Sequence, residues 1–296
     1  MNAREGSGTN SRVGLLQGRV CLITGANSGI GKATALGLAR LGATVVLASR
    51  DTERGGIARR DIIEKTENPE VSVGQVDLAS LESVRSFAKS FNEKFPHLHV
   101  LVNNAGIYES RRIVTVDGFE STFAINHLAH FLLTNLLLES LKASAPSRIV
   151  NVTSEAQRAG HVNFDDLQGE RKYSGMKSYP QSKLANVLFT YELARRLKGT
   201  EVTANCVHPG TVRTNFGRNS GGFMALAVKI FAPFMLSPED GAKTVVWLAS
   251  SPEVEHVTGK YFQKQAERKS TKESYDLNVA RRLWDVSSEL TGLTQT

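Results

Sequence analysis

The sequence predicts an α/β fold with a doubly wound parallel sheet, and two patterns indicate this class. Short runs of β-branched and other apolar residues, such as "RVCLITG" and "ATVVLASR", alternate with segments of helical length. In those segments, as in "KATALGLARLG", the apolar residues recur at helical spacing. Strands that are apolar throughout are buried on both faces, and parallel strands are joined by crossover helices that cover them. The alternation therefore favours one parallel sheet between two layers of helices.

The expected elements follow one another in a regular order. Strands are expected at 19–25, 43–50, 71–78, 98–106, 147–154 and 201–210. Helices are expected at 32–42, 57–66, 82–95, 123–141 and 180–197. After residue 210 the alternation lapses, and the pattern assigns no further element. Ligands of doubly wound folds bind beyond the carboxyl ends of the strands, so the residues that end strands are the candidates for function.

Length and composition favour a single domain. Of the 296 residues, 41% are hydrophobic and 22% are charged, as in ordinary globular proteins. An α/β domain of ~250 residues often folds around one core. We expect a flexible N-terminal arm at 1–17 and one domain at 18–296, with a small C-terminal substrate lid at about 215–240.

The net charge of +7 raises the question of a polyanionic partner. Part of the excess lies at 260–272, but no RNA-binding motif or zinc finger accompanies it, so we expect a solvated basic face and no nucleic-acid partner. Peripheral membrane contact through the lid and this basic tail stays an open alternative. Cys21 and Cys206 each lie in an apolar run, which predicts two buried thiols in a reducing compartment. With no secretory signal and no apolar stretch of ~20 residues, we expect a cytoplasmic protein.

The first strand and the first helix meet at the turn "TGANSGIG", residues 24–31. Glycines at such a turn let the backbone approach a pyrophosphate, whose charge is favoured by the amides of the helix N-terminus. The turn therefore predicts a dinucleotide site, with a tight connection that binds no ligand as the alternative. The cofactor-binding residues expected here are Gly25, Asn27, Ser28, Gly29, Ile30 and Gly31.

The end of the second strand bears on the choice between NAD and NADP. A carboxylate there would bind the ribose hydroxyls of NAD, whereas an arginine accommodates the 2′-phosphate of NADP. Ser49 is neutral and Arg50 follows it, with Lys32 and Arg54 near enough to assist. These residues favour NADP(H), while Asp51 leaves NAD open as an alternative.

Three further motifs accompany the glycine turn: "NNAG" at 103–106, "YPQSK" at 179–183 and "HPG" at 208–210. With four motifs in this order, the chain resembles the short-chain dehydrogenase/reductases over about 18–214. A long insert at 158–178 and the tail "RRLWDVSSELTGL" are similar to the retinol dehydrogenase-like branch of that family. The resemblance implies a Rossmann fold and an oxidoreductase that transfers a hydride between a nicotinamide and a carbonyl or alcohol.

The same resemblance implies roles for particular residues. The implied catalytic residues are Asn126, Ser154, Tyr179 and Lys183. Cofactor contacts are implied for Asp77, Leu78, Asn104, Ala105, Gly106, Tyr179, Lys183, Pro209, Gly210, Val212 and Thr214. In carbonyl reduction Tyr179 would donate a proton to the oxygen that Ser154 holds, and Asn126 would bind a water linking Lys183 to solvent.

Tyr179 and Lys183 are four residues apart, which places them on one face of a helix. A free phenol has a pKa of ~10, and a nearby ammonium lowers that pKa by stabilising the phenolate. We therefore expect Lys183 to make Tyr179 a usable acid and base near neutral pH. Pro180 is expected in the first turn of the helix, where its missing N–H costs nothing.

Substrate and assembly are less closely defined. The apolar run 222–236 lies where the family places its substrate lid and predicts a hydrophobic aldehyde or alcohol. The family also implies a homo-oligomer, through the helices that bear Asn126 and Tyr179. The alternative to an enzyme is a sensor or scaffold protein that binds NADP without turnover, against which the complete set of four catalytic residues argues. His127 and His130 lack a third ligand at metal spacing, so no metal site is predicted.

Overall fold

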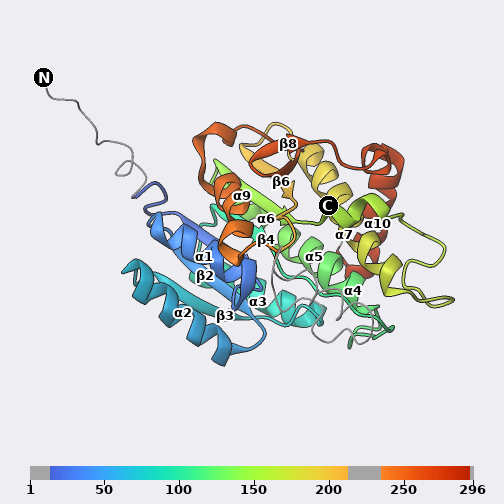
Figure 1. Cartoon of the computed structure of the whole chain (residues 1–296), viewed down its shortest axis with the longest axis horizontal. Helices are drawn as coiled ribbons and strands as arrows, with labels where there is room; N and C mark the ends of the chain where they lie inside the picture. Colours follow the sequence, from blue (N-terminus) through green and yellow to red (C-terminus); the bar gives the residue numbers. More distant parts are fainter. Residues whose placement is uncertain (1–13, 213–234, 294–296) are drawn as a thin grey trace, which may run out of the picture.

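The computed structural model of the chain describes residues 14–212 and 235–293. Within these residues eight strands form one sheet, in the order β3-β2-β1-β4-β5-β6-β7-β8 (Figure 1). The strands are β1 Val20–Thr24, β2 Thr44–Ser49, β3 Val71–Gln75, β4 Val100–Asn103, β5 Ser147–Val152, β6 Val202–Val207, β7 Tyr261–Gln263 and β8 Ala266–Arg268. Neighbours pair in parallel, except β7 and β8, which are antiparallel. The predicted doubly wound parallel sheet is confirmed.

The helices alternate with the first six strands as the sequence predicts. They are α1 Gly29–Arg40, α2 Thr52–Thr66, α3 Leu81–Lys94, α4 Ser121–Phe123, η1 Ala124–Leu128, α5 Ala129–Leu136, α6 Leu138–Ala143, η2 Glu155–Ala159, α7 Gly175–Arg196, α9 Pro238–Ser250, η4 Pro252–Val254, η5 Lys272–Tyr275 and α10 Leu277–Thr291. The sequence pattern missed α9, β7, β8 and α10. Strands of three residues, such as β7 and β8, are too short to show a period of two.

Each strand sends successive side chains to opposite faces of the sheet, and the helices bury both faces. Cys21 and Ile23 of β1 pack with α1 and α9 on one face, where Leu38 is also buried. Leu22, between them in sequence, packs with α3, α5 and α7 on the other face, where Phe189 is buried. This two-sided burial explains why the strands read as uninterrupted apolar runs in the sequence.

The predicted helix at 123–141 is interrupted in the structure. Residues Ala124–Leu128 form a π-helical turn between α4 and α5, and a second break falls at Leu137 between α5 and α6. The π turn contains Asn126, whose side chain bonds to the backbone of Ile107 while its carbonyl lies 3.2 Å from Nδ1 of His130. The contacts with Ile107 come from outside the helix, and the His130 ring takes up a carbonyl within it, so the apolar pattern alone does not reveal the π turn.

The predicted start of the helix at Pro180 is wrong. Helix α7 begins at Gly175, so Pro180 lies inside the helix rather than in its first turn. Ser174 is in extended conformation, and its carbonyl accepts hydrogen bonds from the N–H groups of Lys177 and Ser178. The helix therefore starts within the insert, and Tyr179 lies more than one turn from the positive end of the helix dipole.

Helix α10 covers two helices that the family resemblance assigned to an oligomer interface. Trp284 of α10 packs against Phe131 of α5 and Phe189 of α7, with ring centroids 4.9 and 5.8 Å apart. Ser287 of α10 also lies 2.9 Å from Nε2 of His127. A face of α5 and of α7 is thus buried within the chain itself, and the homo-oligomer stays a prediction.

Other sequence-based expectations concern the terminal segment and the thiols. Leu16 is buried and its N–H donates to the Leu41 carbonyl at 2.8 Å, so the packed part of the chain begins before Gly18. Cys21 and Cys206 are buried free thiols, as predicted, and burial raises the pKa of each to about 12. None of the described helices has the length and apolar character needed to cross a bilayer. The described residues contain no group of three or more His, Cys, Asp or Glu that fits a metal ion.

Candidate active site

A cavity of about 560 Å³ opens beyond the carboxyl ends of β1, β4, β5 and β6. It gathers residues from four motifs that are far apart in the sequence. The predicted site residues that line it are Gly25, Asn27, Ser28, Gly29, Ile30, Gly31, Asn104, Ala105, Gly106, Ser154, Tyr179, Lys183, Pro209, Gly210 and Val212. The order of strands in the sheet brings these motifs to one edge.

The glycine turn is packed too closely for side chains. Gly25 and Gly29 have φ angles of +64° and +55°, in the left-handed region that favours glycine. Gly31 has an ordinary φ, but a Cβ there would lie 2.4 Å from the Gly25 carbonyl oxygen and 2.5 Å from Nδ2 of Asn104. The turn and the segment after β4 therefore form one close-packed platform.

Hydrogen bonds tie this platform to the helix that bears Asn126. Oγ1 of Thr24 accepts the N–H groups of Asn104 and Ala105 at 2.9 and 3.1 Å, and lies 2.9 Å from Nε2 of His130. Burial lowers the pKa of His130 to about 3, so its ring is neutral. Thr24 then donates to Nε2, and Nδ1–H of His130 donates to the Asn126 carbonyl. His130 thus links the end of β1 to the π turn.

The start of α1 fits the pyrophosphate of a dinucleotide. Ser28 is the N-cap residue, but its side chain makes no capping hydrogen bond. Ser28 therefore leaves the first N–H groups of α1 without a side-chain cap, and they lie where the glycine turn borders the cavity. A helix N-terminus of this kind favours an anionic ligand. The residues present thus fit a dinucleotide with its phosphates at α1.

Tyr179, Lys183 and Ser154 meet on the other side of the cavity. Lys183 is only 3% exposed, and its Nζ donates to the Val152 carbonyl at 3.3 Å. That Nζ lies 5.7 Å from the centroid of the Tyr179 ring. A Cβ on Gly106 would lie 3.2 Å from the same nitrogen, so the glycine leaves room for the amine.

The electrostatics of this pair differ from the sequence-based expectation. Burial raises the pKa of Tyr179 to about 12, and the hydrogen bond with the Ser154 side chain opposes this rise. Burial also lowers the pKa of Lys183 from 10.5 to about 8. The expectation of a lowered Tyr179 pKa is wrong for this structure, because poor solvation of the phenolate has the larger effect and the net shift is upward. At neutral pH the chain therefore holds Tyr179 as a protonated acid beside a mostly protonated amine.

Asn126 lies behind the cavity and holds two of its walls together. Its Oδ1 accepts the Ile107 N–H at 2.8 Å, and its Nδ2 donates to the Ile107 carbonyl at 3.0 Å. Nδ2 also lies 3.0 Å from Oγ of Ser182, which donates to the Tyr179 carbonyl at 2.8 Å. Asn126 thereby joins the segment after β4 to the turn of α7 that carries Tyr179.

Comparison with known proteins agrees with this geometry. The family model described as short chain dehydrogenase matches residues 19–222. The chain belongs to the short-chain dehydrogenase family. Human retinol dehydrogenase 14 is 49% identical over 298 residues, which cover 95% of this chain and 88% of that protein. Human retinol dehydrogenase 13 is 48% identical, over 94% of this chain and 86% of that protein. The predicted resemblance to the retinol dehydrogenase-like branch is confirmed.

Solved structures of short-chain dehydrogenases have the same fold. An uncharacterized protein from Mycobacterium paratuberculosis matches with a TM-score of 0.78 and 36% identity, covering 97% of this chain and 98% of that chain. The RhlG/NADP complex from Pseudomonas aeruginosa matches with a TM-score of 0.67 and 26% identity, covering 83% and 94%. Family membership makes this chain an oxidoreductase that binds a nicotinamide cofactor and acts on CH–OH or C=O groups.

Three of the described residues that were predicted to contact the cofactor do not line the main cavity of this short-chain dehydrogenase. Arg50 and Asp77 line a second cavity, of about 540 Å³, between β2, β3 and α3. Oδ1 of Asp77 accepts the Ala79 N–H at 3.0 Å. Leu78 is buried in the core beside α3, and Thr214 lies outside the described residues.

Sequence reasoning missed several residues that line the dehydrogenase cavity. Tyr108 lies edge-on to Tyr179, with ring centroids 6.0 Å apart, and Glu109 follows it along the cavity wall. His208 also lines the cavity, and burial lowers its pKa. Tyr108 and Glu109 follow "NNAG" and Ile107 in the sequence. Their closeness to the end of a strand could have identified them as candidate site residues.

Replacing Gly31 by Ala should weaken cofactor binding, because the new methyl group would overlap the Gly25 carbonyl and separate the turn from Asn104. We expect the dissociation constant for NADPH, measured by fluorescence titration, to rise by at least ~10-fold, which corresponds to ~1.4 kcal/mol. Gly56→Ala in α2 is the control, since the nearest atom to its Cβ is 3.7 Å away. Unchanged affinity in Gly31→Ala would refute the close packing of the turn.

The low pKa of Lys183 predicts a cost in stability. The folded state disfavours the charged amine, so the cost is present below the folded pKa of about 8 and disappears as pH rises toward the unfolded value of 10.5. Lys183→Met should therefore raise the free energy of unfolding at pH 7 by roughly 1–3 kcal/mol, and this gain should shrink between pH 8 and 10.5. Urea denaturation measures it, with exposed Lys177→Met on α7 as the control. A loss of stability at pH 7 would contradict the assignment.

Proposed function

We propose that this chain is an NADP(H)-dependent oxidoreductase that transfers a hydride between the nicotinamide and a hydrophobic aldehyde or alcohol. The observation that carries the proposal is the meeting of Tyr179, Ser154 and Lys183 at one cavity with the glycine turn. This arrangement combines an acid, an oxygen-binding hydroxyl and a cation within one site that also fits a dinucleotide.

Each residue has a defined task in this proposal. Tyr179 donates its proton to the carbonyl oxygen in reduction, and in oxidation it takes the proton from the alcohol. Ser154 holds that oxygen by a hydrogen bond while negative charge develops on it. The charge on Lys183 favours the phenolate that forms as Tyr179 gives up its proton. When bound, the cofactor supplies or accepts the hydride.

The end of β2 supports NADP(H) over NAD(H). Ser49 is buried and its hydroxyl donates to the Asp51 carbonyl at 3.0 Å. The Asp51 carboxylate caps α2 by accepting the Arg54 N–H at 2.9 Å, so one of its oxygens is already engaged in a hydrogen bond. Arg50 is exposed at the end of the strand, whereas Lys32 forms an ion pair with Asp61 at 2.9 Å. Arg50 is therefore the residue we assign to the 2′-phosphate.

A hydrophobic substrate is supported by the walls beside Tyr179 and by the relatives. Ile107, Tyr108, Ile125 and Met235 line the same cavity as Tyr179, and the Tyr108 ring lies edge-on to the Tyr179 ring. Eight relatives, the human and mouse forms of retinol dehydrogenases 11, 12, 13 and 14, are between 46% and 49% identical to this chain. An extended apolar aldehyde with one polar end suits such a cavity.

Removing the hydroxyl of Tyr179 tests the proposed chemistry. Tyr179→Phe should lower kcat for NADPH-dependent reduction of a long-chain aldehyde by ~10²–10⁴-fold, because the proton donor is lost, while cofactor binding is retained. Tyr191→Phe is the matched control: Tyr191 is buried on the same helix, and its hydroxyl bonds to Ser270 at 2.8 Å. Turnover by Tyr179→Phe that equals the control would exclude the assigned acid.

Arg50→Ala tests the cofactor choice. Loss of a charge-assisted hydrogen bond costs ~1.5–3 kcal/mol, so the KM for NADPH should rise by roughly 10–100-fold while the KM for NADH stays unchanged. Arg60→Ala, which removes an exposed arginine from α2, should change neither value. Equal effects on both cofactors would remove Arg50 from the 2′-phosphate site.

A further inference from the structure

Glu120 is a buried carboxylate with more partners than a helix cap requires. Its residue is 1% exposed and precedes α4. Oε1 accepts the Thr122 N–H at 2.8 Å, and Oε2 accepts the Phe123 N–H at 2.9 Å, which caps the helix. Each oxygen also contacts a hydroxyl from a distant segment: Tyr173 at 3.2 Å from Oε1 and Ser178 at 2.8 Å from Oε2.

Two hydrogen bonds fasten the start of α7 on both sides of Tyr179. Ser178, directly before it, donates to Glu120. Ser182, three residues after it, binds Asn126 at 3.0 Å and donates to the Tyr179 carbonyl. Positions four apart share one helical face, so Ser178 and Ser182 face the same α4 and η1 segment. Tyr179 is thus held between two points of attachment to one neighbouring element.

The hydroxyl of Tyr173, the second one at Glu120, also contacts the cavity wall. Tyr173 donates to the Glu109 carbonyl at 2.8 Å while lying against Glu120. A Cβ on Gly175 would lie 2.3 Å from the same carbonyl oxygen and 3.0 Å from the Tyr108 ring. The insert therefore packs against the cavity wall that contains Tyr108, whose ring faces Tyr179.

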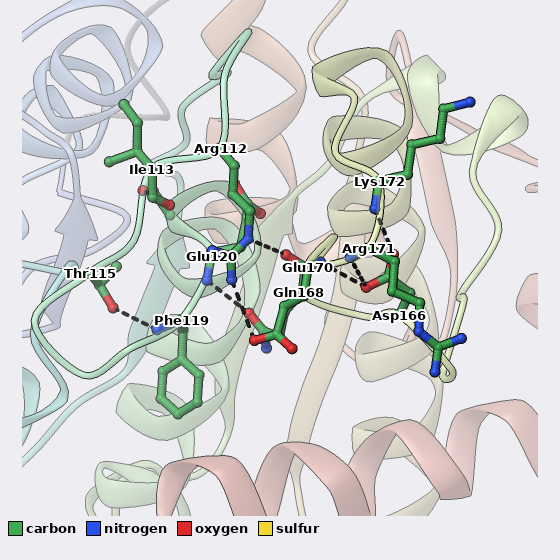
Figure 2. Close-up of polar contacts among 11 residues, drawn as sticks. Arg112, Ile113, Thr115, Phe119, Glu120, Asp166, Gln168, Glu170, Arg171 and Lys172 are labelled. Carbon is green, nitrogen blue, oxygen red and sulfur yellow. Dashed lines mark hydrogen bonds and ion pairs between the residues drawn. The ribbon is translucent and has the colours of Figure 1, made fainter.

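Further contacts hold the insert against the segment before α4 (Figure 2). Oε1 of Gln168 accepts the Glu120 N–H at 2.8 Å, and its carbonyl accepts Nε of Arg112 at 2.9 Å. Arg112 also pairs with Glu170 at 3.5 Å. The Asp166 carboxylate closes the loop by accepting the N–H groups of residues 170–172. The insert is thus folded, and it packs against the segment that contains Glu120.

We infer that Glu120 is a positioning residue for Tyr179: it fixes the start of α7 and the insert relative to the helix that carries Asn126. It acts through Ser178 and Tyr173 and touches neither substrate nor cofactor. The inference rests on the proposed function, because the position of Tyr179 matters for proton transfer. An ordinary cap would bond only to the backbone of α4, and would leave the helix that bears Tyr179 unaffected.

The test uses Ser178, because replacing Glu120 would also remove the cap of α4. Ser178→Ala should lower kcat about 10-fold, which is the effect of losing one hydrogen bond that orients the acid, while the KM for NADPH stays unchanged. Ser178→Thr keeps the hydroxyl and should retain most of the turnover. Ser147→Ala is the matched control. Ser147 is 1% exposed, its hydroxyl donates one hydrogen bond, to the Leu141 carbonyl at 2.8 Å, and it lies at the start of β5, far along the strand from Val152.

A second readout does not depend on turnover. Amide hydrogen exchange of residues 175–182 should be faster in Ser178→Ala than in the wild type, and unchanged in Ser178→Thr and Ser147→Ala. Unchanged exchange in Ser178→Ala, or equal loss of kcat in the Ala and Thr variants, would overturn the inference. If the wild type reduces no carbonyl, the proposed function fails, and the exchange rates alone decide whether Glu120 positions α7.

Discussion

The functional site depends on keeping the amine of Lys183 inside the protein. Charged amines are costly to bury, and this one is accommodated by the Val152 carbonyl, the missing side chain of Gly106 and the neighbouring ring of Tyr179. Lys183 is therefore fixed from three segments: α7, the end of β5 and the turn after β4. Moving any of these segments would take a contact away from a buried cation. This requirement couples the sheet edge to the helix that carries the proposed acid.

The rest of the site consists of connections that preserve this arrangement. The glycine turn packs on Asn104, and Thr24 and His130 continue the connection to the π turn at Asn126. Asn126 and Glu120 in turn bond to serines on either side of Tyr179. Polar groups that are buried and fully bonded favour one arrangement over its neighbours, which is what proton transfer over hydrogen-bond distances requires.

The sequence predicts those features that short-range patterns encode. Apolar runs predicted the first six strands of the sheet, and glycine spacing predicted the turn at β1. The π turn at Asn126 and the start of α7 at Gly175 depend on partners such as Ile107 and the insert, which periodicity does not reveal. The direction of the Tyr179 pKa shift was predicted wrongly. The spacing of Tyr179 and Lys183 is visible in the sequence, whereas the burial of Tyr179, which raises its pKa, results from several segments packing together. Glu120 was missed for the same reason.

The central claim is that the cavity brings a nicotinamide and a carbonyl carbon together beside Tyr179. The most direct measurement uses NADPH labelled with deuterium on one face of C4 of the nicotinamide, with mass spectrometry of the alcohol formed from an apolar aldehyde. The account predicts one deuterium on the carbinol carbon from one labelled face and none from the other, because the site fixes the ring relative to the substrate. Product without deuterium from either face, or with equal amounts from both, would contradict it.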